Sequence, residues 1–241
     1  MGEVLAGSNA VWEFEPDAVV IRYSRGVRGS RLLQALGERR VPHEALEDVE
    51  LVPGRRGTVV LRATPHPGVD PLIEVAGGQL RESADPYRLV LPEQSAELAE
   101  AARDDLLAAV RTAAVTADPP GGRYLVPAPA VPRSFKAYDA KATFDGHAVG
   151  FHWFRTGAST AKWNSGDQTF PVEELCGVDW RSPEQVHGHL RLLLRDPAEP
   201  LPPADRDPAS VIFGLGYGSV HESLPFAAAV LAAIRTSRVR P

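Results

Sequence analysis

The sequence predicts a mainly β (α+β) protein built from two tandem β-rolls or sandwiches, each capped by one C-terminal α-helix. Three observations support this prediction. Five blocks of sequence recur in the same order in the two halves of the 241-residue chain. The first four blocks alternate apolar with polar residues, as half-buried strands do, and the fifth has the spacing of an amphipathic helix. A repeat of this kind indicates that one ancestral module was duplicated.

The first block spells a strand, a turn and a second strand in each half. It reads "VWEFEPDAVVIRY" at Val11–Tyr23 and "ATFDGHAVGFHW" at Ala142–Trp153. An aromatic residue precedes the turn in both copies, Phe14 in the first and Phe144 in the second. Residues two apart point to the same face of a strand, so we expect each copy to bury this aromatic residue against its own helix.

The next three blocks are short runs rich in β-branched and apolar residues, bounded by Gly, Pro or Asp. These features are typical of strands and turns. The paired segments are Val41–Leu51 with Phe170–Trp180, Thr58–Arg62 with Arg191–Arg195, and Asp85–Leu91 with Asp207–Phe213.

The fifth block predicts the closing helix of each module. It reads "LLAAVRT" at Leu106–Thr112 and "VLAAIRT" at Val230–Thr236. In the first copy, apolar residues recur at three- or four-residue spacing from Leu98 onward, which predicts that they face the core. In the second copy we expect the helix to begin near Ser223, with Pro225 tolerated in its first turn.

A proline-rich connector separates the two copies. The segment "ADPPGGRYLVPAPAVPR", residues 117–133, is too rich in proline for a continuous helix or a central strand. The predicted organisation is therefore a first repeat at 1–116, a linker at 117–133 and a second repeat at 134–241.

Composition excludes several classes of protein. The formal net charge is −5, which argues against a dedicated nucleic-acid binder. The single cysteine, Cys176, rules out an intrachain disulfide and fits a reducing interior. The N-terminus lacks the pattern of a secretion signal and no run is long enough to cross a bilayer, so we expect a cytoplasmic protein.

Strands followed by one closing helix are the outline of a pleckstrin-homology-like domain. The likeness is most specific at "ATFDGHAVGFHW", "FPVEELCGVDW" and "VIFGLGYGSVHESLPFAAAVLAAI". On these motifs the chain resembles an actinobacterial domain-of-unknown-function family of tandem pleckstrin-homology-like domains. The first repeat departs from the pattern, because "EFEPD" replaces "TFDGH" and the glycine stretch is missing.

The resemblance implies a non-catalytic binding or scaffolding protein that acts through protein partners or self-association. Modules of this kind work through a sheet edge, a loop rim or a groove beside the helix. The alternative from another class is an enzyme with a site between the two modules. The sequence identifies no catalytic residue, cofactor or metal site.

An arginine-rich segment, "RYSRGVRGSRLLQALGERR", supports a second binding hypothesis. Its basic residues could contact anionic lipid or another polyanion, with Leu32 and Leu33 as an exposed apolar loop tip. The competing interpretation is a solvated loop whose charges balance an acidic domain. The arginines concerned are Arg22, Arg25, Arg28, Arg31, Arg39 and Arg40.

Glycines at 214, 216 and 218 imitate a phosphate-binding turn between a strand and a helix. A dinucleotide site needs a further strand with an acidic residue about 20 positions on, and the chain has no room for one after its last helix. We therefore expect these glycines to serve a hairpin or close strand–helix packing.

Three further candidates have structural explanations. His187 and His189 could share a metal, but no third ligand lies at a familiar spacing. Cys176 lacks a protease signature around it, and no nucleophile elbow is present. Trp163 lies in a predicted loop and is expected at the surface.

Overall fold

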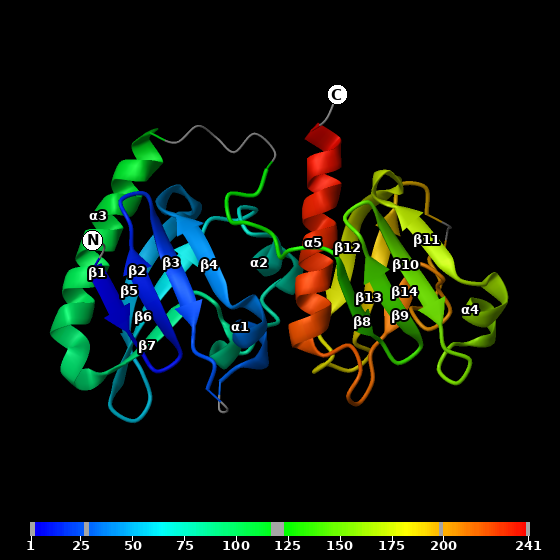
Figure 1. Cartoon of the computed structure of the whole chain (residues 1–241), viewed down its shortest axis with the longest axis horizontal. Helices are drawn as coiled ribbons and strands as arrows, with labels where there is room; N and C mark the ends of the chain where they lie inside the picture. Colours follow the sequence, from blue (N-terminus) through cyan, green and yellow to red (C-terminus); the bar gives the residue numbers. More distant parts are fainter. Residues whose placement is uncertain (1–2, 27–28, 117–122, 198–199, 240–241) are drawn as a thin grey trace. The chain divides into compact units, whose positions relative to one another are not determined.

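The computed structural model describes the chain except at residues 1–2, 27–28, 117–122, 198–199 and 240–241. The chain divides into two compact units, unit 1 with residues 1–70 and 80–127, and unit 2 with residues 71–79 and 128–241. Each unit holds a four-stranded sheet, a three-stranded sheet and a long C-terminal helix (Figure 1). The protein is therefore mainly β with two similar tandem units, as the sequence predicts.

In unit 1 all strand pairs are antiparallel, and the sheets have the orders β1-β2-β3-β4 and β5-β6-β7. Helix α3 packs mainly against β5 and the short helical turn η1. The elements are β1 (Glu3–Ala6), β2 (Ala10–Phe14), β3 (Ala18–Tyr23), α1 (Arg31–Leu36), β4 (Glu38–Pro42), η1 (His43–Ala45), β5 (Leu46–Pro53), β6 (Thr58–Pro65), η2 (Glu82–Ala84), β7 (Arg88–Pro92), η3 (Glu93–Ser95) and α3 (Ala96–Thr116).

Unit 2 repeats this order, with sheets β8-β9-β10-β11 and β12-β13-β14. Its closing helix α5 packs against β12, η4 and β8. The elements are α2 (Pro71–Ala76), β8 (Arg133–Lys136), β9 (Ala140–Phe144), β10 (Ala148–Trp153), α4 (Thr160–Ser165), β11 (Gln168–Pro171), η4 (Val172–Glu174), β12 (Leu175–Arg181), β13 (His189–Leu194), β14 (Ser210–Ile212) and α5 (Val220–Val239).

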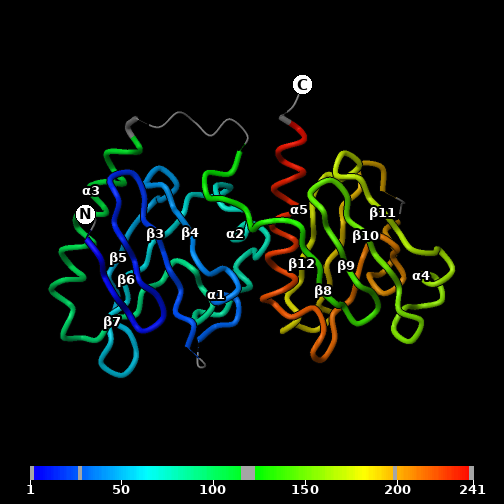
Figure 2. Tube along the Cα trace, in the orientation of Figure 1, coloured from blue at the N-terminus to red at the C-terminus, as the bar shows by residue number. Residues whose placement is uncertain are grey.

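Backbone pairing repeats in detail between the units. Phe14 lies opposite Val19 across β2 and β3, and Phe144 lies opposite Val149 across β9 and β10. Both β5 and β12 carry a register shift after their first residue. Figure 2 traces the chain through the strands of both units. The duplication therefore extends to local irregularities of the backbone.

Helix α3 buries one face against the sheets of unit 1. Its buried residues are Ala99, Ala102, Leu106 and Val110, at three- and four-residue spacing. Leu98 is 61% exposed, so the expectation that it faces the core is wrong. Either Leu98 or Ala99 fits the three- and four-residue spacing at this end of the stripe. In the structure it is Ala99 that faces the core.

Helix α5 is buried on more than one side. Every residue from Ser223 to Val230 is buried, because α2 packs on the helix within unit 2. Leu72 and Val75 of α2 are buried, and the Gln79 side chain hydrogen-bonds the backbone of β12 and of the residue after it. A segment from the first half of the sequence thus completes the core of unit 2.

The start of α5 differs from the sequence prediction. The helix begins at Val220, so Pro225 lies inside the helix and not in its first turn. Ser219 donates a hydrogen bond of 2.7 Å to Glu222, the residue pair of a capping box. Ser223 instead accepts a hydrogen bond from Trp180 at 3.0 Å in the core. No helix within the described residues combines the length and apolar character needed to cross a bilayer.

A buried ion pair distinguishes unit 2 from unit 1. Lys162 Nζ lies 2.6 Å from Asp139 Oδ2, both side chains have no exposed surface, and the ammonium lies 5.1 Å from the centre of the Trp153 ring. Asp139 also accepts a hydrogen bond from the backbone of Ile212. Burial raises the pKa of Asp139 and lowers the pKa of Lys162, against the attraction between the two charges.

The corresponding residues of unit 1 are uncharged. Asn9 occupies the position of Asp139 and holds β7 through hydrogen bonds with the backbone of Arg88 and Val90, at 2.7 and 2.8 Å. Leu33, the third residue of α1, occupies the position of Lys162, the third residue of α4. The two units thus fill one core site with an amide and a leucine or with a carboxylate and an ammonium.

We predict that Lys162→Leu alone lowers the free energy of unfolding by about 3–5 kcal/mol, because it leaves a buried carboxylate without its cation. The double variant Asp139→Asn with Lys162→Leu copies unit 1 and should recover most of this loss. Urea unfolding followed by tryptophan fluorescence measures both effects. A double variant as unstable as the single one would show that the pair cannot be replaced by its uncharged counterpart.

Candidate functional site

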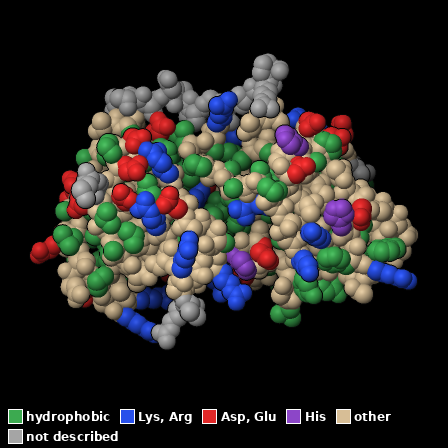
Figure 3. Space-filling model, viewed as in Figure 1, with side chains coloured by type: hydrophobic (Ala, Val, Ile, Leu, Met, Phe, Trp, Pro, Cys, Tyr) green, Lys and Arg blue, Asp and Glu red, His purple; other side chains and the backbone are tan. Residues whose placement is uncertain are grey.

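Two of the arginines in the predicted basic segment are paired with acids on the surface of the first sheet. Arg22 contacts Glu13 and lies 2.7 Å from Glu38. Arg40 lies 3.2 Å from Glu15 and 2.7 Å from Asp17, and its hydrogen bond lowers the pKa of Asp17. Figure 3 shows blue and red side chains lying beside one another over this sheet.

Arg39 points the other way on β4 and is buried. Its guanidinium makes two hydrogen bonds with Asp70, at 2.9 and 2.8 Å. Tyr87 donates a third to Asp70 at 2.7 Å, and burial raises the pKa of this phenol. The expectation that Arg39 meets an anionic ligand is therefore wrong, because the pleat of β4 directs it into a satisfied polar cluster.

The apolar loop tip expected at Leu32 and Leu33 is also wrong. The two residues are only 2% and 3% exposed, because the segment forms α1 and turns them into the core. Arg25 and Arg31 are exposed and form no ion pair in the part of the chain that the structure describes. Arg28 lies outside the described residues.

The glycine-rich segment before α5 is a hairpin, as predicted. Gly214 and Tyr217 form a β-bridge, and Leu215 at the tip is fully exposed. Gly218 has a φ of +68°, and a Cβ there would lie 2.1 Å from the Phe213 ring. These glycines therefore permit a tight turn and close packing.

The histidine, cysteine and tryptophan candidates from the sequence do not form a common site. His189 hydrogen-bonds Asp179 at 3.1 Å, which lowers the pKa of that carboxyl. Cys176 is exposed and its thiol donates to the carbonyl of Leu194. No group of three or more metal-ligating side chains occurs among the described residues. Trp163 is 47% exposed, but it lies in α4 and not in a loop as expected.

A groove that sequence reasoning missed lies along α3 in unit 1. It has a volume of about 440 Å³ and is formed by the helix, the strands β1 and β2, the turn after β2 and the start of η1. We call it the α3 groove. Its lining residues are Glu3, Phe14, Glu15, Pro16, His43, Ala102, Asp105, Leu106 and Ala109.

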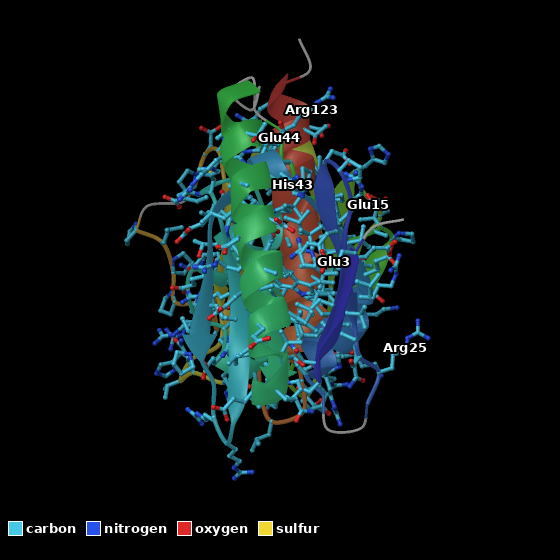
Figure 4. The ribbon with its side chains drawn as sticks, turned by 90° about the vertical axis from the view of Figure 1, so that its left-hand side faces the viewer. Glu3, Glu15, Arg25, His43, Glu44 and Arg123 are labelled. Carbon is cyan, nitrogen blue, oxygen red and sulfur yellow. The ribbon has the colours of Figure 1, made fainter. Side chains whose placement is uncertain are left out.

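The α3 groove has an apolar floor and an acidic rim. Phe14 is only half-buried, although the sequence predicted it in the core. Glu3 and Asp105 form no ion pair with any residue that the structure describes, and Glu15 shares Arg40 with Asp17. Figure 4 shows Glu3, Glu15 and His43 beside α3 on the side of β1 and β2, well apart from Arg25. The rim is therefore negatively charged at neutral pH.

His43 lines this groove and is itself buried. The residue is 6% exposed, and its Nε2 is buried without a hydrogen-bond partner among the described residues. Burial lowers its pKa, against the opposing effects of Asp17 and of a hydrogen bond to the Ala18 backbone.

The same position is closed in unit 2 by one aromatic side chain. Aligning the fifth block places Phe226 at the position of Ala102. The Phe226 ring is fully buried, with its centre 5.0 Å from that of Phe135 and 6.1 Å from that of Phe144. Phe144 is consequently buried, whereas its counterpart Phe14 is not.

The signal for the groove was present in the sequence. Extending the alignment of "LLAAVRT" and "VLAAIRT" backward sets alanine against phenylalanine on the buried stripe of the helix. The polar lining is also specific to unit 1, because Val172 and Ala229 occupy the positions of His43 and Asp105. The helix positions Ala102 and Phe226 lie just before the fifth block, whereas His43 and Val172 lie inside the second.

Comparison with known proteins gives one family. The sequence model described as Domain of unknown function (DUF4429) matches the chain twice, over residues 12–107 and 142–231. Both matches begin inside the second strand of their unit, β2 or β9, and end inside its closing helix, so β1 and β8 lie outside them. No curated protein matches the chain.

We predict that Arg39→Met lowers the free energy of unfolding by about 3–5 kcal/mol, because it leaves the Asp70 carboxylate buried without its cation. The matched control Arg31→Met removes an exposed arginine and should change stability by less than about 0.5 kcal/mol. Urea unfolding of both variants tests the assignment. Equal losses would contradict a structural role specific to Arg39.

Proposed function

The chain belongs to the family Domain of unknown function (DUF4429), in two copies, and from this premise we propose that it is a non-catalytic binding protein whose α3 groove receives a segment of a partner protein. The observation that carries this proposal is the difference between the copies. One fold position is filled by Phe226 in unit 2 and left as a groove by Ala102 in unit 1.

An open groove costs the protein apolar burial. Burying a phenylalanine side chain stabilises a protein by about 1.5–3 kcal/mol, and unit 2 has this contribution from Phe226. Unit 1 forgoes it and leaves Phe14 partly exposed. A binding role explains this difference, because a concave apolar site with a few polar groups is the usual form of a ligand site.

The form of the groove supports a binding role. Its described lining combines apolar side chains with three carboxylates and one histidine. A groove between a helix and strands is a common way to hold a peptide segment.

Binding to anionic membrane through the arginine-rich segment receives less support. Arg22, Arg39 and Arg40 are paired with carboxylates, and Leu32 and Leu33 are in the core. A surface of paired charges attracts anionic lipid weakly, since the attraction grows with each unpaired basic residue. We therefore favour a protein partner.

A pleckstrin-homology-like ancestry supports this proposal only through the arrangement of the two sheets and the closing helix. Two sheets closed by a C-terminal helix leave a boundary between the helix and the edge of the first sheet, and the α3 groove lies at this boundary. In unit 2 the same boundary is packed shut. We propose that unit 1 carries the binding site and that unit 2 does not bind at this position.

We predict that Ala102→Phe fills the α3 groove and removes partner binding without unfolding the protein. The fold already accommodates phenylalanine at this position in unit 2, so the Tm should stay unchanged or rise by about 2–4 °C. Affinity capture from lysate of the source cells, quantified by mass spectrometry, compares the variant with the wild type.

The control is Ala108→Phe, which adds the same ring to the exposed side of α3. It should leave capture unchanged. Proteins retained by the wild type and Ala108→Phe but lost by Ala102→Phe support the proposal. If Ala102→Phe is folded and retains the same proteins, the groove is not the binding site.

A further inference from the structure

We propose that the α3 groove recognises an aromatic side chain carried next to a lysine or arginine on the partner segment. This inference rests on the proposed function, because it names the chemistry of the segment that the groove receives.

The aromatic part of the proposal follows from Phe226. This side chain belongs to the closing helix and packs edge-on against Phe135 and Phe144. Leu5 and Phe14 stand at the positions of Phe135 and Phe144 in unit 1, so two members of this three-residue cluster have counterparts there. The missing partner is an aromatic ring, and edge-to-face contact with Phe14 would add to the burial of its area.

The cationic part follows from the rim. Glu3, Glu15 and Asp105 line the open groove, while the equivalent residues in unit 2 are Arg133, Asp145 and Ala229. The open groove therefore carries a net negative charge, whereas at the closed position Arg133 offsets Asp145. A ligand with a positive charge beside its ring complements this rim, and one with a negative charge is repelled.

The test uses three peptides that differ only at two central residues of a glycine–serine background, with both ends blocked. The central pairs are Phe-Arg, Phe-Gln and Ala-Arg. Each peptide is titrated into the full-length protein, and binding is followed by NMR through the methyl signals of Leu106 and the ring signals of His43. These residues line the groove, so their shifts report occupancy of this site.

We expect the Phe-Arg peptide to bind about tenfold tighter than either of the other two, because it alone supplies both the ring and the charge. Ala102→Phe should abolish the shifts for all three peptides. Asp105→Asn, which removes one rim charge from an exposed position, should weaken Phe-Arg several-fold and leave Phe-Gln unchanged.

Each outcome decides one part of the proposal. Equal affinity for Phe-Gln and Phe-Arg overturns the cationic part, and equal affinity for Ala-Arg and Phe-Arg overturns the aromatic part. If no peptide shifts the groove signals while Ala102→Phe still loses captured proteins, this inference is wrong and the proposed function stands. If the capture experiment shows no loss either, both are wrong.

Discussion

Closure of each β-roll by its own terminal helix is the constraint on which the rest of this structure depends. The helix packs one stripe of side chains against the end of the roll. The size of the side chain at a single helix position decides whether that end is closed or open. Phe226 seals unit 2 through contacts with Phe135 and Phe144. Ala102 leaves unit 1 with the α3 groove. A duplication frees one copy to change in this way, because the other keeps the packed arrangement.

The two units differ in their core polar residues by whole groups of residues and not by single exchanges. The Asp139–Lys162 pair and the Asn9–Leu33 pair satisfy one site in two ways, and exchanging one member alone leaves a buried group unmatched. The Arg39–Asp70–Tyr87 cluster is a similar set in unit 1. Arg39 therefore looks like part of a ligand site in the sequence but stabilises the fold. Its acidic partner, Asp70, is distant in sequence and approaches it only in the folded chain.

The period-two pattern and the repeat were sufficient to predict most strands and the closing helices, but not β1 and β8, which precede the first repeat block in each unit. They could not predict that α1 forms within the arginine-rich segment, because six residues carry too little periodicity, and so Leu32 and Leu33 were placed outside. Phe14 was expected in the core on the strength of its match to Phe144. Its exposure depends on Ala102, which is distant in sequence, and a pattern within one strand holds no information about that contact.

The placement of residues 71–79 has a consequence for how the chain matures. These residues leave the ribosome with the first half of the protein, yet Leu72 and Val75 find their apolar neighbours in unit 2, where α5 ends at Val239. During synthesis Leu72 and Val75 therefore stay unburied until α5 has been made. Cleavage at the proline-rich connector would separate residues 71–79 from α5 and expose the apolar residues of α5 that α2 covers. The later half of the chain is therefore not a self-sufficient folding unit.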